Sequence, residues 1–178
     1  MTGWRLHLAG PADRELILRA DVFDGPAEAD RVAAFMGTDD RPDPRSILIL
    51  ALGAGGVAGF VSGQVQDHPD KPRSLFIIEL GVNEQARRQG IGAALVQAIR
   101  AEGRRRGCRS SWVLTEGGNA PARALYRAAG GAETADVVMY DALVSEALLQ
   151  HAPQAIHVYC GKRAGQHYMK QAQINEGI

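Results

Sequence analysis

The sequence is poor in the features that build disulfide frameworks, metal sites and membrane spans. Its two cysteines, Cys108 and Cys160, stand far apart without metal-binding spacing, which favours two free thiols. No run of about 18 apolar residues is present, so no membrane-spanning helix is expected. The N-terminus has no signal-peptide layout, because Arg5 and His7 interrupt its apolar stretch. We therefore expect a cytoplasmic protein that does not depend on a metal or a membrane.

Two common phosphate-binding motifs and a nucleic-acid-binding pattern are also missing. A Walker loop needs Gly-Lys followed by Ser or Thr, and a dinucleotide fingerprint needs a small residue where Leu95 stands. The run Arg104-Arg105-Arg106 is short and lacks interleaved aromatic residues, which is more typical of a solvated helix end than of a nucleic-acid surface.

What is present fits a globular domain with an uneven charge distribution. The chain has 178 residues, 46% hydrophobic and 22% charged, which suits one domain with a proper core. Residues 1–83 hold 12 acidic and 8 basic side chains, and residues 84–178 hold 8 and 12. The asymmetry indicates a cationic ligand for the acidic half and a polyanionic ligand for the basic half, or merely a solvated surface.

Hydrophobic periodicity predicts strands first and alternating strands and helices afterwards. The predicted strands are 1–8, 46–52, 57–66, 74–82, 110–114 and 137–141, and the predicted helices are 11–20, 28–36, 86–106 and 121–129. Residues 37–44 read as a polar loop. The order predicts a mixed α/β sandwich around a central sheet. We expect one domain over residues 1–143 and a C-terminal extension of unknown role over 144–178, where the periodicity is lost.

The segment 79–95 joins a predicted buried strand to an amphipathic helix through a loop with two arginines and two glycines. The first N–H groups of a helix lack intrahelical partners, and glycines let a ligand come close to them. Arg87 and Arg88 add positive charge. This pattern indicates a pyrophosphate site, although Gly90 and Gly92 alone would also suit a tight helix entry.

The segment 115–131 predicts a second short helix. Asn119 suits its N-cap, Pro121 its first turn and Gly130 its end. From the spacing alone, Tyr126 is more typical of a core aromatic than of a functional residue.

Together the two segments resemble the GNAT family of N-acetyltransferases. The motifs that carry the resemblance are Arg87-x-x-Gly90-x-Gly92 and Asn119-x-x-Ala122-x-x-Leu125-Tyr126, within a similarity that covers roughly residues 4–141. The resemblance implies a mostly antiparallel central sheet with a splayed strand pair, helices on both faces and acetyl-CoA as the cofactor. It also implies a homodimer, and a strand bulge at Gly81.

The resemblance also implies roles for individual residues. The pyrophosphate would be held beside Arg87 by backbone amides of Arg88, Gln89, Gly90, Ile91, Gly92 and Ala93. Leu80 and Val82 would pair by their backbone with the pantetheine arm, which Asn119 would also contact. Ala122 and Tyr126 would belong to the same cofactor site. Tyr126 would protonate the leaving thiolate.

Glu79 is the candidate proton acceptor. An amine attacks a thioester only when neutral, and a lysine-like amine with a pKa of about 10.4 is mostly protonated near neutral pH. Glu79 interrupts an apolar strand, so partial burial would raise its pKa toward a useful range. An exposed strand face or a buried salt bridge is the structural alternative. The amide of Val82 would then stabilise the oxyanion.

The acceptor is expected to be a polycationic small molecule. The candidate substrate-binding residues are acidic: Asp24, Glu28, Asp67, Asp70, Glu79 and Glu116. The patterns Val22-Phe23-Asp24, Arg87-Arg88-Gln89-Gly90-Ile91 and Pro121-Ala122-x-Ala124-Leu125-Tyr126 are similar to aminoglycoside 3-N-acetyltransferases of this family, which implies antibiotic resistance. Alternatives are acetylation of a polyamine, amino acid or protein lysine, and a non-catalytic acyl-CoA-binding module.

Overall fold

The computed structural model describes residues 3–140, 156–159 and 169–172. The chain divides into two compact units, Met1–Glu133 and Thr134–Ile178. The first unit holds every motif discussed above. None of the helices in the described ranges is long and apolar enough to cross a lipid bilayer.

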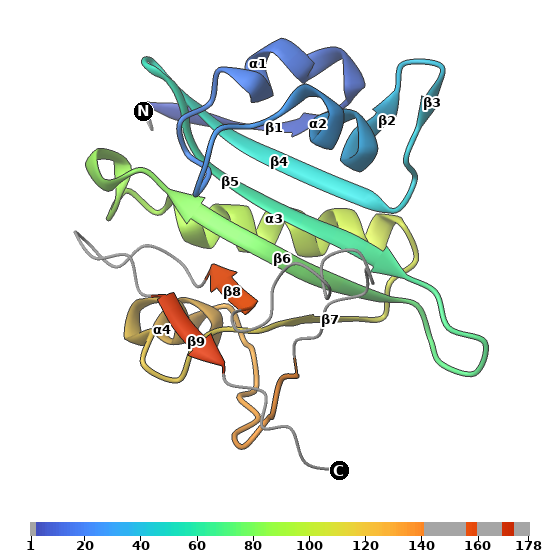
Figure 1. The fold of residues 1–178 in the computed structure, drawn as a ribbon, viewed down its shortest axis with the longest axis vertical. Coiled ribbons are helices and arrows are strands. Elements are labelled where there is room, and N and C mark those ends of the chain that lie inside the picture. The colour runs from blue at the N-terminus through green and yellow to red at the C-terminus, as the bar shows by residue number, and fades with distance from the viewer. Residues whose placement is uncertain (1–2, 141–155, 160–168, 173–178) are drawn as a thin grey trace. The chain divides into compact units, whose positions relative to one another are not determined.

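A five-stranded sheet forms the centre of the first unit (Figure 1). Its strands follow the spatial order β1-β4-β5-β6-β7, and only the pair β6–β7 is parallel. The strands are β1 (Trp4–Ala9), β4 (Ser46–Gly53), β5 (Gly56–Gln66), β6 (Ser74–Val82) and β7 (Ser110–Val113). The mostly antiparallel mixed sheet predicted from the sequence is confirmed.

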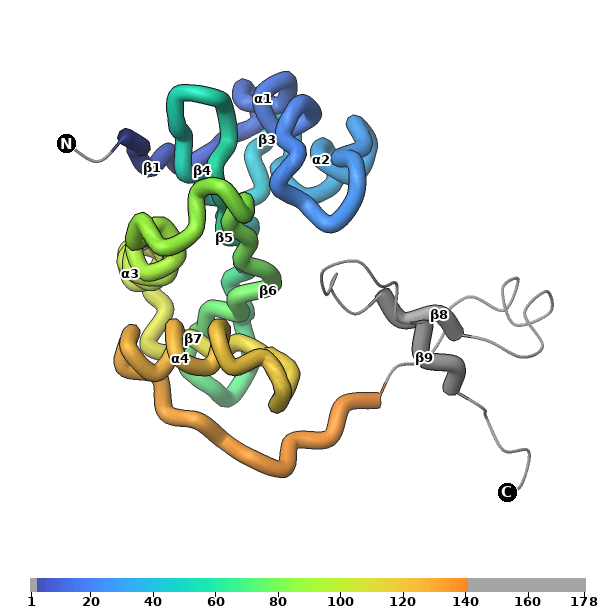
Figure 2. Tube along the Cα trace, turned by 90° about the vertical axis from the view of Figure 1, so that its left-hand side faces the viewer, coloured from blue at the N-terminus to red at the C-terminus, as the bar shows by residue number. Residues whose placement is uncertain are grey.

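Helices cover both faces of this sheet (Figure 2). Helix α3 (Ile91–Arg105) lies on one face, and α1 (Arg14–Leu18) and α2 (Ala29–Met36) lie on the other. The hydrophobic core therefore consists of two clusters, one on each face of the sheet. Ile49 and Leu95 belong to the cluster on the α3 side, and Leu50 and Phe60 to the cluster on the α1–α2 side. Strand β4 is apolar at consecutive positions because both of its faces are covered.

The predicted long helix is interrupted at its start. A short 3-10 helix, η2 (Glu84–Ala86), is followed by a loop, and α3 begins only at Ile91. The predicted first helix likewise divides into η1 (Pro11–Asp13) and α1. The last helix of the unit is α4 (Ala120–Ala128). The polar loop predicted over 37–44 contains a minimal hairpin, β2 (Gly37–Thr38) and β3 (Arg41–Pro42).

The second unit differs from the prediction. Residues 137–140 form no strand, and Val137 and Tyr140 are 61% and 89% exposed; Asp141 lies outside the described residues. An apolar run becomes a strand only where another strand accepts its backbone hydrogen bonds, and none pairs with these residues within the described part. The sequence analysis did not predict the antiparallel pair β8 (Ile156–Tyr159) and β9 (Met169–Ala172).

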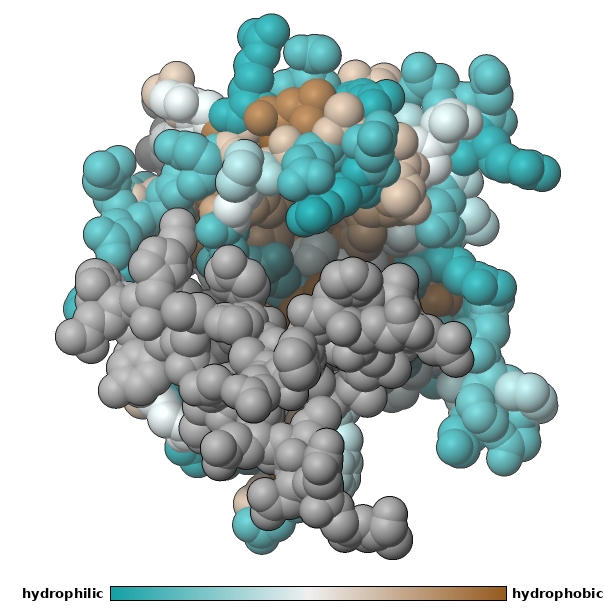
Figure 3. Space-filling view, viewed as in Figure 1, coloured by the Kyte–Doolittle hydropathy of each residue, from teal (hydrophilic) through white to brown (hydrophobic). Residues whose placement is uncertain are grey.

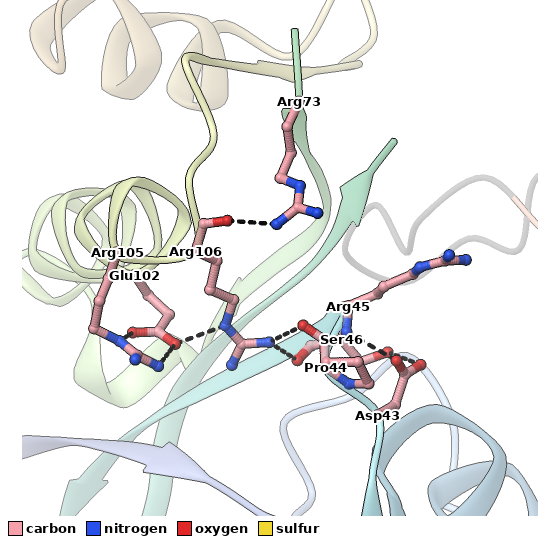
Figure 4. A network of polar contacts seen from close by, with 8 residues as sticks. All are labelled: Asp43, Pro44, Arg45, Ser46, Arg73, Glu102, Arg105 and Arg106. Atoms are coloured by element: carbon pink, nitrogen blue, oxygen red, sulfur yellow. Dashed lines mark hydrogen bonds and ion pairs between the residues drawn. The ribbon is translucent and has the colours of Figure 1, made fainter. Parts of the chain in front are cut away.

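A polar network ties the C-terminal end of α3 to the start of β4 (Figure 4). Arg106 donates from Nη1 to the carbonyl oxygens of Pro44 and Ser46, both at 2.8 Å, and from Nε to Glu102 at 2.7 Å. Hydrogen bonds from Arg105 and Arg106 and their charges lower the pKa of Glu102. The end of α3 is therefore anchored rather than simply solvated, and this fixes the direction in which its N-terminus points.

Candidate active site

Strand β6 extends beyond its pairing with β7 (Figure 1). The parallel pairing runs only from Ser74 to Ile77 on β6 and from Ser110 to Val113 on β7. Beyond Ile77, β6 continues to Val82, and no described strand pairs with that edge of it. The free edge exposes backbone groups that an extended ligand arm can pair with.

The bulge in β6 lies at Ile78 and not at Gly81, where the resemblance placed it. Ser62 pairs with Glu79 and Gly63 with Ile77, so Ile78 is the extra residue. Pairing is regular again at Gly81. The bulge shifts the alternation of side chains, and Glu79 consequently shares the α1–α2 face of the sheet with Ser62.

Gly81 is explained by packing. A Cβ atom at this position would lie 2.7 Å from Cε1 of Phe60 and 3.2 Å from the carbonyl oxygen of Val22. Phe60 in turn packs edge-on against Phe23, with ring centroids 4.5 Å apart. The glycine therefore lets the segment before α2 approach β6 closely.

The loop before α3 has the geometry of an anion cradle. Arg88 and Gly90 both adopt left-handed backbone conformations, with φ of 61° and 79°. The first intrahelical bond runs from the N–H of Ala94 to Gly90, and none of the N–H groups of residues 88–93 donates to an acceptor within the described chain. Successive free N–H groups at a helix N-terminus suit a phosphate or pyrophosphate.

Arg87 is tied to the end of β6. Its Nε donates to the carbonyl oxygen of Val82 at 3.2 Å, and its Nη1 lies 3.5 Å from Oε1 of Glu84. Arg88 is exposed and forms no ion pair within the described residues. Arg87 thus shapes the loop, while the charge of Arg88 is unpaired within the described residues and could pair with an anion.

Helix α4 lies against the start of α3. A Cβ at Gly92 would be 3.4 Å from Cδ2 of Leu125 and 4.0 Å from Cδ2 of Leu80, so α3, α4 and β6 meet at this point. Asn119 caps α4, because its Oδ1 accepts from the N–H of Ala122 at 3.2 Å. Tyr126 follows Leu125 and is half-buried, which raises the pKa of its hydroxyl. The hydroxyl is therefore protonated at neutral pH.

Glu79 is half-buried and lies near enough to Asp24 to be affected by its charge. Burial, and then the negative charge of Asp24, raise the pKa of Glu79. Asp24 lies in the exposed turn between α1 and α2. Neither carboxylate has an ion pair or hydrogen bond within the described residues. Glu79 is therefore half-buried on the sheet without a salt bridge in the described part of the chain, and its role as proton acceptor stays a prediction.

Three other acidic candidates are paired with neighbouring bases. Asp67 accepts from Nε of Arg73 at 2.7 Å and lies 3.9 Å from Nε of Arg45. Asp70 contacts the imidazole of His68. Glu28 lies 3.3 Å from Nε of Arg31, and Glu116 is exposed in the turn before α4. The structure therefore separates Glu79 and Asp24, which lack such partners, from the paired acids.

One group near the site was missed by the sequence analysis. Phe76 on β6 and Trp112 on β7 stack with ring centroids 4.2 Å apart and an interplanar angle of 22°. The stack depends on the parallel register that sets Phe76 beside Trp112, which no local pattern reveals.

Solved structures with the same fold include several aminoglycoside acetyltransferases. One from an uncultured soil metagenomic sample, in complex with sisomicin, aligns with a TM-score of 0.66 and 17% identity over 79% of this chain and 97% of that one. Another is AAC(6')-Iy in complex with the bisubstrate analogue CoA-S-monomethyl-acetylneamine, with a TM-score of 0.65 and 19% identity over 79% and 98% of the two chains. At these identities the likeness shows the fold.

Short matches to curated proteins involve enzymes of other kinds. A siroheme synthase of Actinobacillus pleuropneumoniae is 53% identical over 45 residues, which are 25% of this chain and 9% of that protein. A uroporphyrinogen-III C-methyltransferase of Bacillus subtilis is 40% identical over 65 residues, 36% of this chain and 25% of that protein. The chain spans at most a quarter of the length of these relatives.

The family assignment depends on a longer match that includes the cradle, Glu79 and Tyr126. A model of the acetyltransferase (GNAT) family matches residues 14–130, which is most of the first unit. The chain therefore belongs to the acetyltransferase (GNAT) family, whose acetyl donor is acetyl-CoA.

Proposed function

We propose that the protein transfers the acetyl group of acetyl-CoA to a primary amine of a polycationic small molecule, and that this molecule is an aminoglycoside. The observation that carries the proposal is the pair Glu79 and Asp24, two carboxylates without a cationic partner in the described chain. An ammonium group of the acceptor would supply that missing positive charge.

The residues divide the chemistry among them. Glu79 accepts the proton that the acceptor's ammonium must lose, directly or through water. The N–H of Val82 donates to the thioester oxygen and stabilises the negative charge that develops there. The hydroxyl of Tyr126 donates its proton to the departing sulfur. The amides of residues 88–93 hold the pyrophosphate, and the free edge of β6 orients the pantetheine arm.

The aminoglycoside acceptor is supported by two independent observations. The fold neighbours include aminoglycoside acetyltransferases, one of them in complex with sisomicin. The sequence patterns around Asp24 and Tyr126 resemble 3-N-acetyltransferases, which favours the 3-amino group, whereas AAC(6')-Iy is a 6'-enzyme by name. The proposal includes a homodimer in the cytoplasm and a role in resistance.

A thiol-release assay with acetyl-CoA tests this function. We expect release with sisomicin at a rate well above that with spermidine or lysine, and a rate lower by about 10²-fold or more with Glu79→Gln. NMR of the product then identifies the acetylated nitrogen. Turnover of spermidine without turnover of any aminoglycoside would overturn the proposal that the acceptor is an aminoglycoside. Binding of coenzyme A without turnover of any amine would indicate a non-catalytic module.

A further inference from the structure

A cavity of about 770 Å³ opens at the end of the sheet where β5 ends and β6 and β7 begin. Ser74 and Ser110, which pair across β6 and β7, line it. Gln64, Gln66 and the indole of Trp112 also line it. Small hydroxyls, two amides and one aromatic ring are the groups that bind a hydroxyl-bearing ring through stacking and hydrogen bonds.

The indole of Trp112 is held in place. Phe76 stacks against it, and its Nε1 donates to Oε1 of Gln66 at 3.2 Å across the intervening strand. Trp112 nevertheless remains 43% exposed. A fixed aromatic that keeps this much surface open and lines a cavity is a preorganised stacking platform.

The bulge at Ile78 places this platform on the same face of the sheet as the proton acceptor. Phe76 pairs with Gln64 and Glu79 pairs with Ser62, two residues apart on β5, so all four share one face. Without the bulge, Phe76 and Glu79 would face opposite sides. The strand rise of about 3.3 Å per residue puts Ser74 roughly 15 Å from Glu79.

The charges around the cavity differ from those at Glu79. Asp67 on the rim is matched by Arg73 and Arg45, and Lys71 adds a further positive charge. The connection from 67 to 73 is exposed throughout, and Figure 3 shows its hydrophilic surface. This rim does not attract ammonium groups, whereas Glu79 and Asp24 do.

We propose that the cavity at Trp112 is a second part of the acceptor site, which stacks a hydroxyl-rich ring of a multi-ring amino sugar while Glu79 and Asp24 hold its reacting amine. The inference rests on the proposed function and deepens it. A site of this kind favours extended glycosidic amines over linear polyamines. Only an extended acceptor with a ring far from its reacting amine contacts both the cavity and the two carboxylates.

Trp112→Ala tests the platform, and Trp112→Phe restores an aromatic ring that can stack on Phe76. Leu8→Ala is the matched control, since Leu8 is 46% exposed on the opposite edge strand of the sheet. Steady-state kinetics are measured with sisomicin and with glucosamine, a single-ring amine. The affinity for sisomicin is measured by calorimetry in the presence of coenzyme A, and melting temperatures verify folding.

We expect Trp112→Ala to raise KM and Kd for sisomicin about tenfold, with kcat and the kcat/KM for glucosamine unchanged. Trp112→Phe should recover most of the loss, and Leu8→Ala should change neither constant. Equal sisomicin constants in folded Trp112→Ala and the wild type would overturn the subsite while leaving the proposed function intact. Absence of sisomicin binding to the wild type would overturn both the subsite and the proposed function. Sisomicin binding that depends on Trp112 but is not followed by turnover would support the subsite and overturn only the proposed reaction.

Discussion

Glu79 stands where a carboxylate is costly, half-buried on a sheet face and close to a second negative charge. The apolar neighbours of Glu79 in the sequence predicted its burial, and the structure adds the charge of Asp24, which only the folded chain brings near. Both effects favour the protonated form at rest. The same two effects make the ionised form a better proton acceptor and leave it in need of a cation.

Replacing Glu79 by Gln should lower kcat/KM by about 10²–10⁴-fold, the usual contribution of a general base. It should also stabilise the protein at pH 8. A carboxyl group whose pKa is higher in the folded than in the unfolded protein stabilises the fold below its unfolded pKa. This contribution is lost as the pH rises through the folded pKa. The ionised Glu79 therefore lowers the stability of the wild type at pH 8.

Thermal unfolding at pH 8 and pH 4 measures this effect, with Glu15→Gln as the control because Glu15 is an exposed partner of Arg19. The melting temperature of Glu79→Gln should exceed that of the wild type at pH 8, and the difference should shrink at pH 4. A variant less stable than the wild type at pH 8 would show that Glu79 forms a stabilising contact instead.

Tyr126→Phe should reduce kcat by about 10²-fold or more and leave the Kd for coenzyme A unchanged. Burial raises the pKa of this hydroxyl, so it can donate a proton throughout the neutral range. Stopped-flow thiol release and calorimetry separate the two constants. A weaker Kd with unchanged kcat would instead assign Tyr126 to cofactor binding alone.

Among the elements, the strands that form buried apolar runs were predictable. The bulge and the short strand pairs, which depend on pairing between strands, were not. The strands over 46–52, 57–66 and 74–82 lie within a few residues of their predicted bounds, because they are apolar runs between turn signals. The bulge at Ile78 was misplaced, since it depends on register with β5. The pairs β2–β3 and β8–β9 were missed because their strands are short and give little periodicity.

The candidate site likewise contains one feature that could be predicted from the sequence and one that could not. The left-handed turn before α3 was predictable, because glycine positions indicate where the backbone can adopt such a conformation. The platform of Phe76 and Trp112 was not, because two side chains that are far apart in sequence become neighbours only through the parallel pairing of β6 and β7.

The two glycines of the cradle should respond differently to alanine. Gly90 has a φ of 79° and no atom within 4 Å of the place where a Cβ would stand, so Gly90→Ala costs about 1 kcal/mol in backbone strain alone and should weaken coenzyme A binding severalfold. Gly92→Ala places its Cβ against Leu125 at an ordinary 3.4 Å and improves helix propensity, so affinity should be kept and the melting temperature should rise.

Calorimetry with coenzyme A and thermal unfolding of both variants provide the comparison. Equal losses of affinity in Gly90→Ala and Gly92→Ala would contradict the assignment of the left-handed turn at Gly90 to the cradle.

For the whole molecule, the first unit is organised so that the site forms at the end of the sheet where its parallel pair separates. Two cores hold the sheet from both faces, and the network at Arg106 anchors the far end of α3 to β4. The cradle, Glu79 and Tyr126 all lie within Met1–Glu133. We therefore propose that the acetyltransferase domain ends by residue 143 and is followed by a C-terminal extension of unknown role.

A chain that stops after Leu143 should fold and bind coenzyme A with the affinity of the full chain, because every residue assigned to the cradle is retained. Circular dichroism and calorimetry on both chains check this expectation. Loss of binding in a properly folded short chain would show that residues 144–178 complete the site.

We propose that Glu79, whose pKa is raised by burial and by the charge of Asp24, accepts the proton of the acceptor amine. The dependence of kcat/KM on pH in the wild type and in Asp24→Asn tests it most directly, since the amine of the acceptor titrates alike in both proteins. We expect the acid limb of the wild-type profile to move to lower pH in Asp24→Asn, because a neighbouring negative charge that raises the pKa of Glu79 is removed. An acid limb at the same pH in both proteins would contradict it.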